Sequence, residues 1–500
     1  MQCWSVSGVV LVSLGVLAPP VSSSAAFAPQ ADTGVSAGIG AAGVQSVGRL
    51  TGEQVRRDLL LLERALETLH PGYERYTPRA ALDANLARLR ASMGSGATVE
   101  AMYLGVSDHL ARIRCDHTKA EYPDSIRVHR ESNPTHLPMT AIVRGGRMFV
   151  GACEPGSGLV VGDEILEIDN EPVVSLLGRI RGLVSIDGYT EHSRDDEIEL
   201  TSEYMGSALE QYLPLLHGWS DARDVLVRRG DEFLRPRVAC VAWEKFLALA
   251  PEAGYQDFID SIRVTYPGEG VAALWVGTFV NYRRPIDPDE AYGPIFAALA
   301  ERGVEHLIVD LRNNGGGSTD AAVGLARRLI RTPVTSGPGS FVRATRTPED
   351  LRVFLSTWDE SAFEPPQEMF EPAGSLYRIR EVTVTVGPAD DAFAGRVTLL
   401  TSRGNASGVT NLLATLAGQP HITTVGEPTG GSAVGPTAGT IVFLRLPESG
   451  ITVRVPLVWG KNDCPGAVEG LGVTPDVVVK IEPEDVLAGR DPVLEEAMRR

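Results

Sequence analysis

The chain has 500 residues, of which 43% are hydrophobic and 6% aromatic, enough for about three soluble domains. Its formal net charge is −18, and no basic run suited to a phosphate backbone occurs, so we expect no nucleic-acid partner. Lysine is scarce, and arginine carries most of the positive charge; the lysines are Lys119, Lys245, Lys461 and Lys480.

The first 26 residues have the pattern of a secretory signal peptide, although no Lys or Arg precedes the apolar stretch. That stretch, residues 9–18, is too short to span a bilayer as a helix, and small residues follow it. We therefore predict an exported protein, periplasmic or secreted, with residues 27–48 as a disordered lead. The alternative is an apolar tail with little order. No later segment has the composition of a membrane span.

Residues 49–120 are predicted to form a helical region. Thr51 and Gln54 have the spacing of a capping box, and leucines then recur at intervals of three and four. A second helix is expected to begin with Pro78 in its first position, and a third follows. His70, between the first two helices, is expected to be structural.

Residues 125–245 change to alternating strand patterns. The stretch "GLVVGDEILEIDNEPV" resembles a PDZ domain, a class that binds peptide ends by adding a strand to a sheet edge. Residues 255–485 alternate apolar strands with helices, which indicates a mixed or parallel sheet, and residues 341–372 are expected to form an excursion that covers a site. Residues 486–500 form a final predicted helix. The fold class is therefore a mixed α/β multidomain chain.

The stretch "TSRGNASGVTN" places Ser407 where a predicted strand turns into a helix, between the two smallest side chains. One interpretation is an N-cap, because serine at a helix start accepts a hydrogen bond from a free backbone N–H. The other is a nucleophile that is uncrowded and close to free amides.

A glycine-rich turn follows another predicted strand in "VDLRNNGGGSTDA". Its glycines leave backbone N–H groups unobstructed, which suits a phosphate or an oxyanion. The turn lacks the Lys-Ser/Thr of a P-loop, so the sequence argues against nucleotide binding. A flexible turn without a ligand is the alternative.

Four motifs, "VDLRNNGGG", "LTSRGNASG", "TTVGEPTGG" and "EGLGVTPDVVV", occur in this order. Together they resemble the C-terminal-processing (tail-specific) peptidase superfamily, which implies a catalytic domain of the ClpP/crotonase-like type. The resemblance implies that Ser407 is the nucleophile. It also implies an oxyanion hole made by the amides of Gly408 and Gly316, with Gly317 as the alternative to Gly316.

The tail-specific branch of this superfamily uses a lysine base, but here Ser432 stands in its place and no lysine lies between residues 246 and 460. Serine needs a base to act as a nucleophile. The branch similar to the tricorn core and the chlamydial protease-like activity factor supplies a histidine and a glutamate instead. That resemblance implies a Ser-His-Glu triad of Ser407, His117 and Glu469.

The function predicted from these motifs is hydrolysis of peptide bonds in protein or peptide substrates by an exported serine endopeptidase. No cofactor is implied, and no Cys or His spacing suggests a metal site. The oligomeric state is left open. The alternative is a non-catalytic protein of the same fold that binds ligands or peptides, because such a relative exists in the superfamily.

Four cysteines remain once the signal peptide is removed: Cys115, Cys153, Cys240 and Cys464. They allow three pairings in an oxidising compartment. If His117 and Glu469 meet at one site, their chain segments also meet, so a Cys115–Cys464 bridge is one hypothesis. Four buried free thiols are the other.

Overall fold

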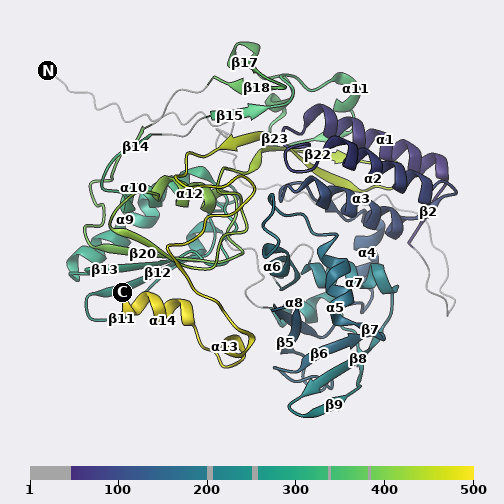
Figure 1. Ribbon diagram of the computed structural model, residues 1–500, viewed down its shortest axis with the longest axis horizontal. Coiled ribbons are helices and arrows are strands. Elements are labelled where there is room, and N and C mark those ends of the chain that lie inside the picture. The colour runs from purple at the N-terminus through teal and green to yellow at the C-terminus, as the bar shows by residue number, and fades with distance from the viewer. Residues whose placement is uncertain (1–46, 200–205, 251–256, 336–338, 381–384) are drawn as a thin grey trace.

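A computed structural model describes residues 47–199, 206–250, 257–335, 339–380 and 385–500 (Figure 1). The predicted signal peptide, and the predicted disordered lead up to residue 46, lie outside the described residues. Within the described part of the chain, no helix combines the length and apolar character needed to cross a bilayer.

The N-terminal region is helical, as predicted. Thr51 and Gln54 form the expected capping box at the start of the first helix. Pro78 is the N-cap of the second helix and not its first helical residue, because its ψ of 140° is extended. The helices are α1 (Gly52–Leu69), α2 (Arg79–Ser92) and α3 (Val99–Ile113), with a short pair of strands β1 (Arg49–Leu50) and β2 (Ala97–Thr98) beside them.

A seven-stranded antiparallel sheet follows, with strand order β10-β8-β6-β5-β4 and with β7 on β6 and β9 on β8. Its strands are β4 (Met139–Arg144), β5 (Arg147–Cys153), β6 (Glu164–Ile168), β7 (Glu171–Pro172), β8 (Ala222–Arg229), β9 (Glu232–Leu234) and β10 (Arg237–Ala239). The helices of this part are α4 (Asp124–Ser132), α5 (Val173–Arg181), α6 (Ser193–Glu199), α7 (Ala208–His217) and α8 (Trp243–Ala248).

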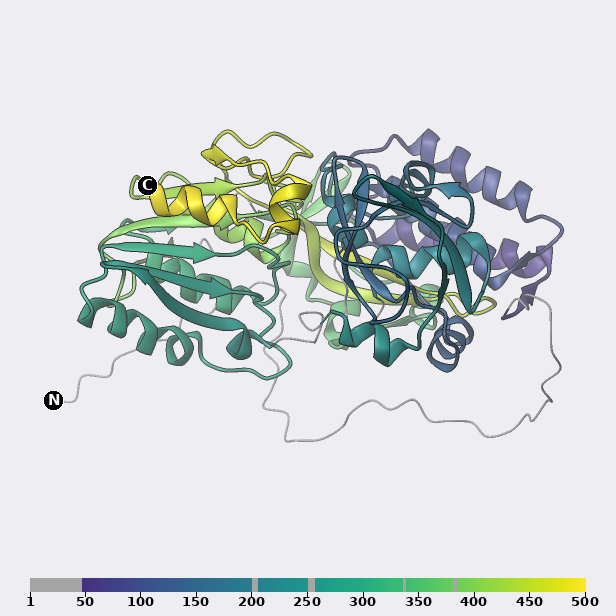
Figure 2. The same cartoon turned by 90° about the horizontal axis from the view of Figure 1, so that it is seen from below.

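The C-terminal half contains a six-stranded sheet with the strand order β11-β12-β13-β20-β21-β24. Its strands are parallel from β12 onward. Helices α9, α10 and α12 pack on one face, whereas α14 packs on the other, as Figure 2 shows. The strands are β11 (Ile262–Gly268), β12 (Val271–Val276), β13 (His306–Asp310), β20 (Arg396–Thr401), β21 (Ile422–Gly426) and β24 (Val477–Val478). The helices are α9 (Pro288–Glu301), α10 (Thr319–Leu329), α12 (Gly408–Leu416), α13 (Pro483–Leu487) and α14 (Pro492–Arg499).

A third sheet has the order β16-β22-β23-β15-β18-β17. The sequence pattern predicts its strands β22 and β23 as part of the α/β domain, but it does not predict that they form a separate sheet. The excursion at 341–372 supplies edge strands to this sheet. The members are β15 (Gly339–Val342), β16 (Leu355–Ser356), β17 (Phe370–Ala373), β18 (Leu376–Ile379), β22 (Thr437–Arg445) and β23 (Thr452–Lys461), with β14 (Val334–Thr335), β19 (Thr385–Val386) and α11 (Glu349–Arg352) nearby in sequence.

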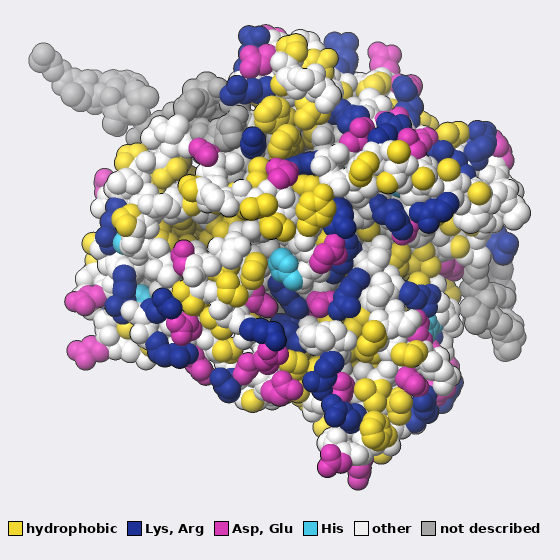
Figure 3. Space-filling view, viewed as in Figure 1, with side chains coloured by type: hydrophobic (Ala, Val, Ile, Leu, Met, Phe, Trp, Pro, Cys, Tyr) yellow, Lys and Arg dark blue, Asp and Glu magenta, His cyan; other side chains and the backbone are white. Residues whose placement is uncertain are grey.

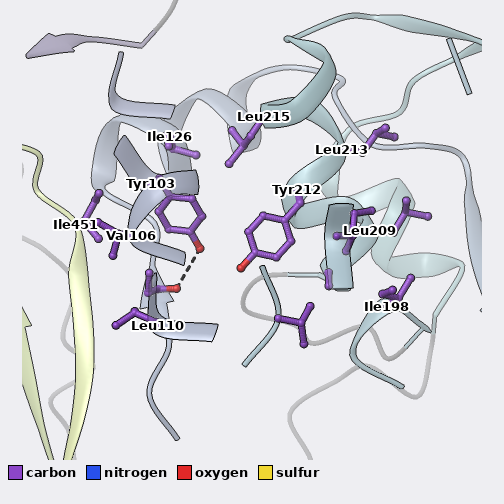
Figure 4. Packing of buried hydrophobic residues seen from close by; sticks show 14 of the residues in the cluster. Tyr103, Val106, Leu110, Ile126, Ile198, Leu209, Tyr212, Leu213, Leu215 and Ile451 are labelled. Atoms are coloured by element: carbon purple, nitrogen blue, oxygen red, sulfur yellow. Dashed lines mark hydrogen bonds between the residues drawn. The ribbon is translucent and has the colours of Figure 1, made fainter. Parts of the chain in front are cut away.

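This third sheet ties the two halves of the molecule together. Strand β3 (Ala120–Glu121), from the N-terminal part, pairs antiparallel with β23. The largest apolar core accordingly runs from α1 and α3 through α7 to β22 and β23, and Figure 4 shows Tyr103, Tyr212 and Ile451 within it. The Tyr103 hydroxyl donates to the carbonyl of Ala120 at 3.0 Å, so its polar end is satisfied.

The exposed surface mixes both charge signs, and Figure 3 shows basic and acidic side chains interspersed on one face. The four cysteines in the described residues are free, so the Cys115–Cys464 bridge does not form. The Cys115 thiol is buried and faces the Thr437 carbonyl oxygen at 3.3 Å, which gives it a polar partner within the third sheet.

Candidate active site

Ser407 lies at a sharp turn between β20 and helix α12, as predicted. Its backbone angles, φ 50° and ψ −117°, belong to a region that costs a non-glycine residue about 1–3 kcal/mol. Ser407 occupies the N-cap position, but its side chain makes no capping hydrogen bond. The N-cap interpretation therefore does not explain the serine, whereas a strained strand-to-helix turn is the arrangement that presents a nucleophile.

The loop before Ser407 is locked to the glycine-rich turn by Asn405, a residue that sequence reasoning did not select. The Asn405 side chain is fully buried and donates to the carbonyls of Leu311 at 2.6 Å and Asn314 at 3.1 Å. It also accepts a hydrogen bond from the amide of Ser402 at 2.7 Å. The position of Asn405 within "RGNASG" was the only sign of this role in the sequence.

The two loops meet because their strands are neighbours. Strands β13 and β20 pair in parallel, with Asp310 opposite Leu400, so the turn after each strand emerges at the same edge of the sheet. Arg312, which begins the glycine-rich turn, binds Asp310 at 2.6 Å and Asp491 at 2.7 Å. Asp491 is the N-cap of α14, so this helix, on the opposite face of the sheet from α12, also holds the glycine-rich turn through Arg312.

Gly316 packs directly against the Ser407 turn. Its φ is 105°, and a Cβ at this position would lie 2.6 Å from the amide nitrogen of Gly408. The Gly316 N–H, however, donates to the Asn314 side chain at 2.8 Å. Among the hydrogen bonds of the described residues, none uses the N–H of Gly317 or of Gly408. The geometry thus favours Gly317, the alternative donor, as the partner of Gly408.

Replacing Gly317 by alanine is expected to lower kcat by about 10²–10³, the usual effect of losing one oxyanion-hole donor. Gly317 has φ 135°, and a Cβ would lie 2.3 Å from the Phe279 carbonyl carbon, so the turn must move. Gly315→Ala is the matched control, because a Cβ there meets nothing within 4 Å. The measurement is kcat beside the melting temperature; full kcat in a folded Gly317→Ala protein would contradict the assignment.

His117 lies in the loop between α3 and β3 and is half-buried. Its Nδ1 atom is buried and has no hydrogen-bond partner among the described residues. Behind it, His70 Nδ1 accepts from the Gly72 amide at 3.0 Å, so His70 Nε2 donates to the Thr118 hydroxyl at 2.8 Å. Burial lowers the pKa of His70 to about 3, so this supporting histidine stays neutral.

Asp187 is the carboxylate that the fold places beside His117, and no sequence motif pointed to it. Its carboxylate lies within 4.8 Å of a His117 ring nitrogen. It accepts hydrogen bonds from the amides of Asp116 at 3.0 Å and Ser432 at 3.4 Å. Burial raises the pKa of Asp187, and the nearby His117 opposes that shift. Asp187 is 70 positions from His117 in the chain, so spacing alone could not reveal the pair.

The segment of Gly431 and Ser432 lies between Asp187 and Ser407, because the Ser432 amide binds the Asp187 carboxylate. The preceding residue, Gly431, is so close to the Ser407 turn that a Cβ on it would lie 3.2 Å from the Ser407 nitrogen. The contacts therefore run from Ser407 through residues 431–432 to Asp187 and His117. No described hydrogen bond joins Ser407 directly to His117.

Glu469, the predicted third member of the triad, has a different partner. Its carboxylate binds Arg75 at 2.7 Å, and its side chain is 53% exposed. The Arg75 guanidinium is itself held over the Trp459 ring at 4.3 Å. The Glu469 segment does adjoin the Asp187 loop, because the Gly470 carbonyl accepts from the Tyr189 amide at 2.6 Å. No described hydrogen bond or ion pair connects Glu469 with His117.

No described hydrogen bond or ion pair joins a lysine to Ser407, and Lys461 is exposed. Lys119 is the nearest in sequence to His117, and its ammonium binds Asp116 at 2.9 Å and Glu197 at 3.1 Å. The paired carboxylates raise its pKa against the opposing effect of burial, so Lys119 stays charged. Lys245 and Lys480 contact other carboxylates, Glu154 and Glu482. The ammonium groups of Lys119, Lys245 and Lys480 are therefore each paired with a carboxylate.

Part of the chain matches a known protein family, and its fold matches solved structures. Residues 287–479 match the profile of peptidase family S41. No curated protein matches the chain in sequence. The structure is similar to mature CPAF complexed with lactacystin, at 15% identity and a TM-score of 0.59, over 90% of this chain and 97% of that one. A mutant of CPAF gives 15% identity and a TM-score of 0.60 over 87% and 94% of the two chains.

The family match, together with the strand-turn-helix serine and the glycine-rich turn, defines a serine-type peptidase. The solved structures show that the fold is shared with CPAF over nearly the whole chain. The family match covers residues 287–479 of the C-terminal half, and the rest of the chain shares its fold, but no family profile, with known proteins. Its substrates are accordingly proteins or peptides.

Proposed function

We propose that the chain is an exported serine endopeptidase that uses Ser407 as nucleophile and His117 as general base. The observation that carries this proposal is the strained Ser407 turn, which lies beside two glycine amides that make no described hydrogen bond. Export is supported by the pattern of the first 26 residues.

In the proposed reaction, Ser407 Oγ attacks the carbonyl carbon of the scissile bond while His117 accepts the hydroxyl proton. The N–H groups of Gly408 and Gly317 stabilise the negative oxygen that forms. His117 then gives the proton to the leaving amine, and water hydrolyses the acyl-enzyme by the reverse sequence of proton transfers. The hydrogen bond between His117 and Ser407 forms when substrate is bound, since such bonds are often long in the free enzyme.

The carboxylate that orients His117 is, in this proposal, Asp187. It is buried at 2% exposure, next to the imidazole, and held by two backbone amides, which is how an orienting carboxylate is usually fixed. Glu469 instead has a structural role in this proposal. Its ion pair with Arg75 holds the loop at Gly470, whose carbonyl accepts from the Tyr189 amide.

Asp187→Asn is expected to lower kcat by about 10²–10⁴ with little change in KM, because the imidazole loses its orienting charge. Glu469→Gln is the matched comparison and is expected to stay within a few-fold of wild type, since its half-exposed carboxylate contacts Arg75 and has no described contact with His117. Steady-state kinetics of both variants is the measurement. The reverse ranking would return the orienting role to Glu469.

The proposed activity is tested by incubating the full chain with a mixture of denatured proteins and sequencing the new termini. Internal cleavage that requires Ser407 supports an endopeptidase. Absence of cleavage, with retention of peptides on the immobilised protein, would favour the alternative of a non-catalytic binding protein on the same fold.

A further inference from the structure

Three side chains of different chemistry converge beside the proposed base. The Cys115 sulfur, a His117 ring nitrogen and an Asp187 carboxylate oxygen all lie within 4.8 Å of one another. Cys115 and Asp187 are buried, at 3% and 2% exposure, and His117 is half-buried. The group is assembled by two loops, one after α3 and one after α5, so it is a product of the fold and not of a sequence motif.

These are the ligand types that Zn²⁺ takes in proteins: thiolate, imidazole and carboxylate, usually in a tetrahedral arrangement. Three protein ligands leave a fourth position for water. The His117 Nδ1 atom is buried without a hydrogen-bond partner among the described residues, so the imidazole has a nitrogen available to a ligand. Asp187 is fixed by the amides of Asp116 and Ser432, the kind of outer contact that orients a ligating carboxylate.

We propose that Cys115, His117 and Asp187 bind a divalent transition-metal ion of the zinc class, and that this binding switches the peptidase off. The Cys115 thiol loses its proton to solvent as the sulfur–metal bond forms, so binding releases one proton per metal ion. A metal ion on the imidazole occupies the group that must accept the Ser407 proton. The inhibitory part rests on the proposed role of His117, whereas the metal binding itself does not.

A second group in the described residues, made of three carboxylates, is a weaker candidate for a metal site. Glu63, Glu67 and Asp83 lie close together, but each is already paired with an arginine. Arg90 binds Glu63, and Arg79 binds both Glu67 and Asp83. The Cys115 group contains no such cation, which leaves its carboxylate available to a metal.

Binding is tested by titrating the full chain with Co²⁺, whose thiolate complexes absorb in the near ultraviolet. We expect one Co²⁺ per chain with a thiolate band, and loss of the band when Zn²⁺ is added. Cys115→Ser keeps a hydroxyl that can face the Thr437 carbonyl, yet it should remove the band and weaken binding by more than the about 10–100-fold that loss of an outer contact costs. Cys153→Ser is the matched control, because that thiol also faces a backbone carbonyl, of Leu159, but lies outside the group.

The inhibitory part is tested by the ratio of cleavage rates with and without Zn²⁺, taken for each variant against its own metal-free rate. Wild type and Cys153→Ser should lose activity and regain it with a chelator, and Cys115→Ser should resist zinc. A missing thiolate band, a band lost in Cys153→Ser, or unchanged metal affinity in Cys115→Ser would overturn the proposal. If the wild type cleaves nothing, the proposed function fails, but the cobalt spectra still decide the metal site.

Discussion

Ser407→Ala is expected to lower kcat for peptide-bond hydrolysis by about 10⁴–10⁶, because removal of a triad nucleophile leaves only binding and the oxyanion hole. The melting temperature should stay close to that of wild type. Alanine keeps the Cβ of serine at the same φ of 50°, so the strain of the turn is unchanged, and no capping hydrogen bond is lost.

The measurement is the cleavage rate of a denatured protein, combined with labelling by a fluorophosphonate probe. The label should appear on wild type and be absent from Ser407→Ala. Ser432→Ala is a useful control, because Ser432 binds Asp187 through its backbone amide, which the substitution leaves in place. Undiminished proteolysis by a folded Ser407→Ala protein would refute the mechanism.

His117→Ala is expected to lower kcat about as much as Ser407→Ala does, and the double variant should be no worse than either single variant. Members of a catalytic unit act together, so their losses do not add. Lys461→Ala is the control, since this exposed lysine has no described contact with Ser407. The measurement is the cleavage rate of these four variants at one pH. If His117→Ala were active and a lysine variant inactive, a Ser-Lys mechanism would apply.

The sequence predicted the features that depend on local pattern or on adjacent strands. The capping box at Thr51 is a contact within one helical turn, and the structure confirms it. The approach of Ser407 to the glycine-rich turn follows from two neighbouring parallel strands whose ends share one sheet edge. The mixed α/β class followed in the same way from the alternation of strands and helices.

The features that escaped prediction depend on partners far away in the chain. No spacing rule predicts the contacts of Asp187 and Asn405, because these contacts form only when separate loops meet. The role of Glu469 stays a prediction from its motif, and the motif did not reveal that its carboxylate pairs with Arg75. The strands of residues 437–461 have ordinary strand patterns, which do not specify the sheet they join.

The pairing of β3 with β23 sets an order for the assembly of the site. The strand beside the His117 loop pairs with Thr452 and Val453, and Arg454 donates its amide to the Lys119 carbonyl at 2.9 Å. These partners follow Ser407 in the chain, so synthesis completes the nucleophile turn before it completes the strand that holds the base. Contacts of such long sequence separation form late in folding. Under the proposed mechanism, a nascent chain would carry Ser407 without a positioned His117 until the two halves have joined.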